Sequence, residues 1–440
     1  MNSSQTFDHR LDSVMGYLAL AYLAMLFLAV PLGGRFLAAD LFAPMLLWQL
    51  WRKREALLDV LLTEAKWLVL AFAWMSLALS VQFMRGSGTL YDFAVFGYMA
   101  VIYCFYRVTP LPNRRICTWT GVVLIALCLL GWLAARLLPA TPLAQRLLYT
   151  DIHFEQLAPN QLVVRYQFLF NNPNLLGSAY IIPVILLLPL LKEQLGTLKR
   201  WWKAALLALI CFIACLPLLA TASKHLVMTF GLLAGTWTLL PLIPRRWTVP
   251  FATVAVSLFG MLCLITVLFQ TYPALQQAPW VDFSKRGNYF VHQEIYAKIL
   301  LHEGVGGTLF GHSLAELQAL YPKYADAEKI YAILEPYGFG GETDQFITFM
   351  DPHQEYLNFA SFFGIPALLA LVAFLLAHAR QAVRIQRWET MLFVLGLLLA
   401  FCWDDLGSKR WIWAALGILA QTRSTMQGSA SGVAQSTTRE

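Results

Sequence analysis

Residues 351–370 read DPHQEYLNFASFFGIPALLA and place a polar cluster around one histidine at the start of an apolar run. Asp351 suits a helix N-cap and Pro352 the first helical position, while Gln354 follows the cap by three residues, as in a capping box. We therefore expect a helix that begins at Pro352 and carries His353 in its first turn. Because the positive end of a helix dipole disfavours imidazolium, His353 is expected to be neutral and able to accept a proton at about pH 7. A histidine that only caps the helix fits the same pattern.

The composition of the chain is that of a membrane protein. Of its 440 residues, 59% are hydrophobic and 13% are charged, and the mean hydropathy is +0.60. A soluble domain has roughly 25% charged residues, so this chain could not hide its apolar surface from water. The formal net charge of +7 then indicates basic residues on one side of a bilayer rather than nucleic-acid binding. We predict an all-α polytopic membrane protein in contact with lipid.

Apolar runs of near-membrane length predict about twelve transmembrane helices. The runs lie at 14–31, 36–50, 67–84, 91–106, 117–137, 174–191, 204–222, 226–243, 248–270, 358–378, 390–403 and 411–422. Residues 1–270 would hold helices 1–9, with a modest loop near 138–172. Residues 271–357 would form a large, partly helical loop, and residues 358–422 helices 10–12. The small polar residues at 423–440 predict a disordered tail.

Arginines and lysines determine the predicted orientation. With the N-terminus inside, the even-numbered connections carry the basic clusters at 52–54, 107–115, 192–203, 245–246 and 380–387. Cytoplasmic loops are enriched in lysine and arginine, so both termini are predicted to be cytoplasmic and the large loop to be periplasmic. The sequence has no apparent internal repeat, which counts against an inverted-repeat transporter.

Further polar residues fall on the predicted outer face. They include Arg165, Asn174, Lys224, Arg286 and Tyr289. The asparagine also suits a turn or cap, and the lysine could extend to lipid phosphates. We predict an amphipathic helix over 286–303 and a tight glycine turn over 304–311. In the hairpin at 404–410, Asp404 or Asp405 could orient a cation or a sugar hydroxyl, or could pair with Lys409 and Arg410.

One candidate base and several cations on one face suit glycosyl transfer from a lipid pyrophosphate. The leaving diphosphate needs positive charge, and the acceptor hydroxyl needs a base. The glycines at 304–311 lack the Lys-Ser/Thr of a phosphate-binding loop, and no HExxH is present. Neither a cofactor nor a metal is therefore predicted.

Four motifs together resemble those of the O-antigen ligase family, within the O-antigen ligase/polymerase superfamily. They are NPNLLG at 172–177, the Lys-Arg pair at 285–286, the glycines at 304–311, and PHQEYLNFASFFGIPALL at 352–369. The resemblance covers roughly residues 90–420. It implies a glycosyltransferase C-like membrane fold in the bacterial inner membrane, with the active site facing the periplasm.

The resemblance also implies an activity and roles for single residues. Members join O-antigen polysaccharide, carried on undecaprenyl pyrophosphate, to lipid A–core oligosaccharide by metal-independent, inverting transfer. His353 would be the base, and Arg165 and Arg286 would hold the pyrophosphate. Lys224 stands where the family has an arginine; it supplies charge but no bidentate fork. The predicted substrate-binding set is completed by Asn174, Tyr289 and Tyr356.

Other functions remain open on the sequence alone. An O-antigen polymerase would extend the glycan on its lipid, and a protein O-oligosaccharyltransferase would transfer it to Ser or Thr. A lipid-linked glycan transporter, of a different class, would recognise the donor with the same cations and make no bond. Polymerases tend to have two substantial periplasmic loops, whereas this chain has one large and one modest loop, which favours the ligase.

Overall fold

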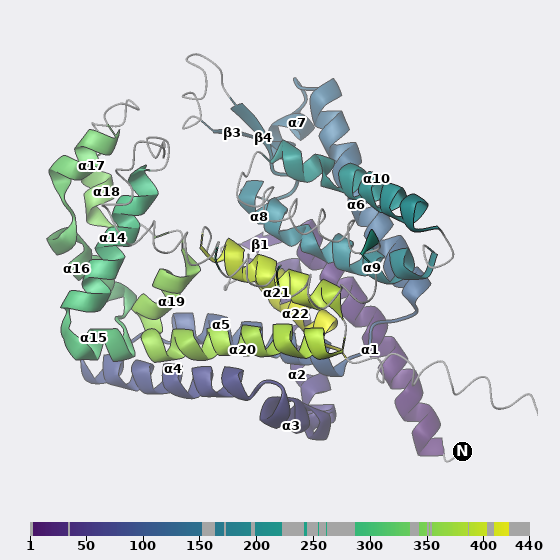
Figure 1. The fold of residues 1–440 in the computed structure, drawn as a ribbon, viewed down its shortest axis with the longest axis horizontal. Coiled ribbons are helices and arrows are strands. Elements are labelled where there is room, and N and C mark those ends of the chain that lie inside the picture. The colour runs from purple at the N-terminus through teal and green to yellow at the C-terminus, as the bar shows by residue number, and fades with distance from the viewer. Residues whose placement is uncertain are drawn as a thin grey trace, which may run out of the picture.

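The computed structural model describes fourteen stretches of the chain. They are residues 3–33, 36–151, 163–170, 173–194, 199–221, 242–243, 254, 261, 287–334, 343–349, 352, 354–385, 387–402 and 409–421. These residues are predominantly α-helical (Figure 1), and their β structure is confined to two short antiparallel strand pairs. The predicted helical class is therefore confirmed for the described part of the chain.

The first half of the chain supplies the helices at the centre and right of Figure 1, together with α4 at the lower left. In order they are α1 (Ser3–Leu28), β1 (Pro31–Gly33), β2 (Phe36–Leu37), η1 (Ala38–Phe42), α2 (Ala43–Arg52), α3 (Arg54–Thr63), α4 (Lys66–Met84), α5 (Tyr91–Val108), α6 (Arg114–Leu137), α7 (Pro142–Leu147), β3 (Leu148–Asp151), β4 (Val163–Tyr166), α8 (Pro173–Ala179), α9 (Ile181–Gln194) and α10 (Arg200–Ala220).

The second half forms a lateral group of helices and then returns to the bundle. Its elements are α14 (Gly287–His302), α15 (Gly304–Phe310), α16 (Leu314–Tyr324), α17 (Ala327–Leu334), α18 (Thr343–Thr348), α19 (Glu355–Phe363), α20 (Ile365–Arg384), α21 (Trp388–Ala400) and α22 (Arg410–Ala420). We call α14–α18 the lateral unit (Figure 1, left). The helix predicted at 286–303 is present as α14.

Four described helices are long and apolar enough to cross a membrane. They are Arg10–Leu28, Lys66–Met84, Arg114–Leu137 and Ile365–Arg384. Shorter apolar helices include Phe93–Val108, Leu175–Leu187, Trp201–Ile213, Thr390–Ala400 and Arg410–Ala420. A helix of about 20 residues spans the hydrocarbon core, so the four long helices fit that thickness unaided. The predicted total of twelve spans stays a prediction.

Glycines permit the closest helix contacts of the bundle. A Cβ atom on Gly417 of α22 would lie 2.6 Å from the carbonyl oxygen of Tyr103 in α5. A Cβ on Gly121 of α6 would lie 2.9 Å from the carbonyl oxygen of Pro183 in α9. Small residues at helix crossings let backbones approach and increase packing contacts, which drive helix association where both partners are apolar. These two crossings fix α22 on α5 and α9 on α6.

Polar contacts define two ends of the bundle. At one, Arg107 of α5 donates from Nε to Glu64 at 2.7 Å, and Gln421 after α22 donates to the carbonyl oxygen of Thr109 at 2.8 Å. At the other, Arg410 at the start of α22 pairs with Asp40 of η1 at 3.0 Å. We call these the Arg107 end and the Arg410 end. Helix α22 therefore runs from the Arg410 end to the Arg107 end.

The span predicted at 358–378 is interrupted. Helix α19 stops at Phe363, and α20 begins at Ile365 after Gly364, whose φ is +83°. A Cβ at this glycine would lie 1.8 Å from the carbonyl oxygen of Leu309 at the end of α15. The same carbonyl accepts a 2.8 Å hydrogen bond from Trp74 Nε1 of α4. The helix breaks at Gly364 because Leu309 of the lateral unit packs so closely against it that no side chain fits at this position.

The glycines at 304–311 do not form the predicted tight turn. They form the short helix α15, and a positive φ occurs only at its boundaries, with +83° at Gly304 and +65° at Gly311. A left-handed glycine commonly ends a helix, so the two outer glycines delimit α15 while the inner ones are helical. The prediction was wrong because it treated all four glycines alike.

Candidate active site

Three of the predicted site residues lie outside the described part of the chain. They are the predicted base His353 and the predicted cations Lys224 and Arg286. Asp351, Asp404 and Asp405 also lie outside it. The residues next to them in the chain are described, and their contacts define the surroundings of the predicted site.

For three further predicted residues, the structure gives the helix or strand to which each belongs. Arg165 lies in β4, where it pairs with Tyr149 of β3. Asn174 lies in α8, and Tyr289 lies in the first turn of α14. The structure thus puts these residues on three separate elements.

Gln293 connects the lateral unit to the histidine motif. Its side chain is 2% exposed and donates from Nε2 to the carbonyl oxygen of Pro352 at 3.1 Å. Its Oε1 has no hydrogen-bond partner within the described part of the chain. Pro352 directly precedes His353 in the chain, and Gln293 lies seven residues after Arg286. The helix that begins beside one predicted site residue therefore binds the backbone beside another.

The helix predicted to begin at Pro352 begins instead at Glu355, with Gln354 as its N-cap residue. Gln354 is extended, with φ −148° and ψ 116°, and the N–H of Glu355 donates to the carbonyl oxygen of Phe401 at 2.9 Å. Packing on the end of α21 thus satisfies a donor that a side-chain cap would otherwise bind. The prediction that a helix begins at Pro352 was therefore wrong, while His353 itself lies outside the described residues.

Two residues after the histidine fix α19 against α21. Glu355 is 1% exposed, at the first position of α19, where the helix dipole favours a carboxylate. Tyr356 donates from its hydroxyl to the carbonyl oxygen of Leu398, and its ring lies edge-on to Phe401, with the ring centroids 5.9 Å apart. This hydroxyl holds two helices together, a structural role that the sequence did not indicate. The predicted contact of Tyr356 with substrate stays a prediction.

A second polar group lies at the start of α22. Arg410 is paired with Asp40, and the carboxylate also accepts hydrogen bonds from the N–H of Leu37 at 2.8 Å and from the hydroxyl of Tyr98 at 3.3 Å. The guanidinium carbon of Arg410 lies 5.8 Å from the centroid of the Tyr98 ring. Among the described residues, Arg410 thus pairs with Asp40, 370 positions away in the numbering. The predicted pairing with Asp404 or Asp405 lies outside the described residues.

Trp411 joins this group to the elements that carry Arg165 and Asn174. Its indole Nε1 donates to Ser178 Oγ of α8 at 3.1 Å. Its ring also packs edge-on against Phe170, five residues after Arg165, with the ring centroids 5.7 Å apart. The start of α22 therefore meets both predicted outer segments of the first half of the chain.

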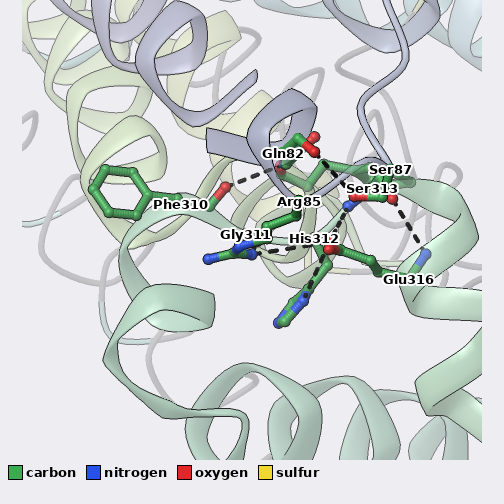
Figure 2. A network of polar contacts seen from close by, with 9 residues as sticks. Gln82, Arg85, Ser87, Phe310, Gly311, His312, Ser313 and Glu316 are labelled. Atoms are coloured by element: carbon green, nitrogen blue, oxygen red, sulfur yellow. Dashed lines mark hydrogen bonds and ion pairs between the residues drawn. The ribbon is translucent and has the colours of Figure 1, made fainter. Parts of the chain in front are cut away.

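A third polar network attaches the lateral unit to α4 (Figure 2). Gln82 Nε2 donates to the carbonyl oxygens of Phe362 at 2.7 Å and Phe310 at 3.2 Å, and Arg85 Nη1 donates to that of Gly311 at 3.3 Å. Arg85 also lies 3.9 Å from Glu316. These donors satisfy carbonyl groups at the ends of α15 and α19, which helix ends leave unpaired.

His312 lies within this network. Its backbone N–H donates to the carbonyl oxygen of Ser361 at 2.7 Å, and its Nδ1 lies 3.7 Å from Glu316 Oε2. Burial lowers the pKa of His312 below its ordinary value, and the nearby Arg85 charge acts in the same direction, while Glu316 and Glu303 oppose it. The imidazole is therefore mainly neutral at about pH 7.

The partly buried carboxylate of Glu294 in the lateral unit is paired with two lysines. Burial of Glu294 would raise its pKa, but hydrogen bonds from Lys298 and Lys329 outweigh this and lower it. The neighbouring His292 is 2% exposed and hydrogen-bonded to the hydroxyl of Tyr321. Burial raises the pKa of Tyr321 above its ordinary value. Among the described residues, no group of three or more His, Cys, Asp or Glu could hold a metal ion.

Gln293 and Asp40 were missed by the sequence analysis. Asp40 is an isolated carboxylate within the apolar residues 36–50, which is a signal for a buried partner. Gln293 had no such signal, because glutamine is ordinary in an amphipathic helix.

The fold and these sites define a predominantly α-helical protein with helices suited to a membrane. No family model matches the chain, and no curated protein matches it.

Proposed function

We propose that the chain is an O-antigen ligase, which transfers polysaccharide from undecaprenyl pyrophosphate to lipid A–core oligosaccharide. The observation that carries the proposal is the hydrogen bond from Gln293 to Pro352. It joins the helix that follows Arg286 to the segment that precedes His353. A base and a phosphate-binding cation must be held by one rigid frame for this reaction, since misplacement by about 1 Å can cost roughly 100-fold in rate.

In the proposed reaction His353 removes the proton of the acceptor hydroxyl. The hydroxyl oxygen attacks the anomeric carbon, the bond from that carbon to the diphosphate oxygen breaks, and the configuration inverts. The negative charge that develops on the leaving diphosphate is stabilised by Arg165, Arg286 and Lys224. Such charge stabilisation removes the need for a general acid at the leaving group.

The second half of the proposed site is the group at the start of α22. Arg410 adds a cation next to α8, which carries Asn174, and Asp40 orients it. Arg410 keeps some solvent access, with 20% of its side chain exposed. A phosphate arriving there would meet a cation already fixed by a carboxylate and an aromatic ring, which lowers the entropic cost of binding.

We infer a glycosyltransferase C-like arrangement of about twelve spans in the bacterial inner membrane, with the active site at the periplasmic face and both termini cytoplasmic. The Arg107 end and the Arg410 end lie at opposite termini of α22. This supports a model in which the basic connections face one side of the membrane and the site faces the other. Protease protection of tags at the two termini in inverted vesicles tests this orientation; tags on opposite sides would overturn it.

The decisive experiment reconstitutes the purified protein with lipid-linked polysaccharide and lipid A–core. We expect a covalent product on the core, unaffected by EDTA. His353→Ala should abolish it, because a positioned general base contributes roughly 100- to 10,000-fold. The matched control is His302→Ala, since His302 is exposed at the end of α14.

Each other outcome assigns a different function. Longer glycan on the donor lipid alone indicates a polymerase, and glycan on a protein Ser or Thr indicates a protein O-oligosaccharyltransferase. Movement of the donor across the bilayer without a new bond indicates a transporter. Full activity of His353→Ala would refute the assignment of the base.

A further inference from the structure

The large exposed side chains of the bundle include six tryptophans, and these lie near helix termini. They are Trp48, Trp51, Trp67, Trp119, Trp201 and Trp202, with exposed fractions of 47%, 70%, 38%, 68%, 77% and 70%. All lie near a terminus of α2, α4, α6 or α10. By contrast, Trp411 and Trp413 at the Arg410 end are buried.

The four helix termini share the Arg107 end. Glu64, between α3 and α4, is hydrogen-bonded to Arg107, which places the end of α3 and the start of α4 there. Helix α6 starts at Arg114, six residues after α5 ends at Val108. Arg52 of α2 pairs with Asp12 of α1, and a Cβ on Gly16 of α1 would lie 2.8 Å from the carbonyl oxygen of Pro110, just after α5. The tryptophans of α2, α4 and α6 therefore lie toward the same end of the bundle.

Helix α10 begins at the same end, because α9 runs antiparallel to α6. Gly121 of α6 contacts Pro183 of α9, and Gly131, further along α6, contacts Tyr166, which precedes α9. Helix α9 therefore ends near the start of α6. A link of a few residues then leads to the start of α10 at Arg200.

Basic side chains accompany these tryptophans. The charged groups of Arg52, Arg54 and Lys66 lie 5.8, 5.7 and 5.9 Å from the ring centroids of Trp48, Trp51 and Trp67, respectively. Further basic residues precede the other rings, namely Arg114, Arg115 and Lys199, all exposed. The acidic residues at this end include Asp8 and Asp12, which pair with Arg52, and Glu64, which pairs with Arg107. They also include the exposed Glu55 and Asp59, and Glu193 and Glu389 near the helix termini of α9 and α21. The basic residues outnumber them.

Helix α3 is too short to cross a bilayer. Its 10 residues extend about 15 Å, half of the hydrocarbon thickness of about 30 Å. Leu58 and Leu62, four residues apart on one face, are 56% and 73% exposed, whereas Val60 is buried. An exposed leucine pair on a short helix flanked by cations fits a helix that lies in the plane of the interface.

We propose that the Arg107 end carries an interfacial belt that binds the anionic headgroups of one membrane leaflet. The belt consists of α3, the six tryptophans and the basic residues Arg54, Lys66, Arg114, Arg115, Lys199 and Lys203. Indole rings favour the headgroup level, where their apolar face and N–H are both satisfied, and the cations attract anionic lipid. The proposal does not depend on the transfer reaction.

The test uses the full chain in vesicles of phosphatidylcholine and phosphatidylglycerol, with either lipid brominated to quench tryptophan fluorescence. We expect brominated phosphatidylglycerol to quench more strongly than brominated phosphatidylcholine. The quadruple variant Arg114→Gln, Arg115→Gln, Lys199→Gln, Lys203→Gln should remove the difference. The matched control, Lys298→Gln with Lys323→Gln in the lateral unit, should retain it.

Two further measurements keep the proposal falsifiable if the quadruple variant does not fold. Salt should reduce the preference of the unaltered chain, since screening weakens attraction between exposed charges. Replacing all six belt tryptophans with phenylalanine should remove most of the lipid-dependent quenching. Equal quenching by the two lipids would overturn the anionic preference, and absence of quenching from these rings would indicate that a protein surface, rather than lipid, covers them.

Discussion

Gln293 and Pro352 are 59 residues apart in the chain and are joined by a hydrogen bond of 3.1 Å, from the side-chain amide of one to the backbone carbonyl of the other. The side chain is buried, so its amide has exchanged water for a single backbone partner. Among the residues that the structure describes, its Oε1 has no hydrogen-bond partner. A buried acceptor left unpaired costs about 1–3 kcal/mol, so a functional role for this position is worth testing.

Gln293→Met tests that role. Methionine keeps the length and apolar stem but cannot donate, so Pro352 would lose its restraint while the core keeps its volume. We expect kcat of glycan transfer to fall about 10- to 100-fold, as misplacement of a catalytic group does, with a small change in thermal stability. Gln318→Met, on the exposed face of α16, is the control. An unchanged kcat in Gln293→Met would show that the contact does not position the base.

Gly364 and Gly304 provide a matched pair of substitutions. Both have φ of +83°, but a Cβ on Gly364 would lie 1.8 Å from Leu309 oxygen, whereas nothing lies within 4 Å of one on Gly304. Gly304→Ala should cost about 1–2 kcal/mol, the cost of a left-handed backbone for an L-residue. Gly364→Ala adds a backbone clash and should lower the unfolding free energy by several kcal/mol more. Equal losses on thermal unfolding in detergent would contradict the close contact of α15 with the α19–α20 junction.

The helical class and many element positions followed from hydropathy alone. The run predicted at 67–84 is α4, and the run at 91–106 is α5, because a lipid-facing helix must be apolar over most of its length. Breaks within a run were not predictable in this way. Gly364 has an apolar environment on both sides in the sequence, and only the contact with Leu309, made by a distant segment, shows why the helix ends there.

For the candidate site, too, local sequence patterns were predictable and tertiary contacts were not. Motif spacing indicated His353 and its neighbours, but the start of α19 was misplaced by three residues because Phe401 satisfies the first donor in place of a local cap. The pairing of Arg410 with Asp40 was also unpredictable, because the two residues are far apart in the sequence. Tertiary partners, which spacing does not encode, explain both differences.

Arg107 and Glu64 form an ion pair, and a double-mutant cycle can measure its interaction free energy. Arg107 is 6% exposed and donates from two nitrogens to the carboxylate. Arg107→Met leaves a partly buried carboxylate without its partner, and removal of one member of a buried pair costs about 3–5 kcal/mol. Because 20% of the Glu64 side chain is exposed, we expect the lower part of that range. The double variant Arg107→Met, Glu64→Gln should recover part of the loss; full additivity in thermal unfolding would argue against a direct interaction.

His312 should make the attachment of the lateral unit sensitive to acid. Because burial lowers the pKa of this histidine, the unfolded chain takes up a proton at a higher pH than the folded chain does. Stability is therefore constant above the ordinary pKa of about 6.5 and falls as the pH decreases toward the lower folded pKa. The groups facing the ring are Glu316 and Glu303, which favour protonation, and Arg85, which opposes it.

His312→Gln removes the titrating group while keeping a polar side chain of similar size. We expect the loss of thermal stability between about pH 7 and pH 5 to be smaller in this variant than in the unaltered chain, because only the latter must pay for protonation of a buried imidazole. His302→Gln, at an exposed position, should keep the full pH dependence. Identical pH dependence in His312→Gln and the unaltered chain would mean that other groups, and not the imidazole beside Glu316, cause the acid sensitivity.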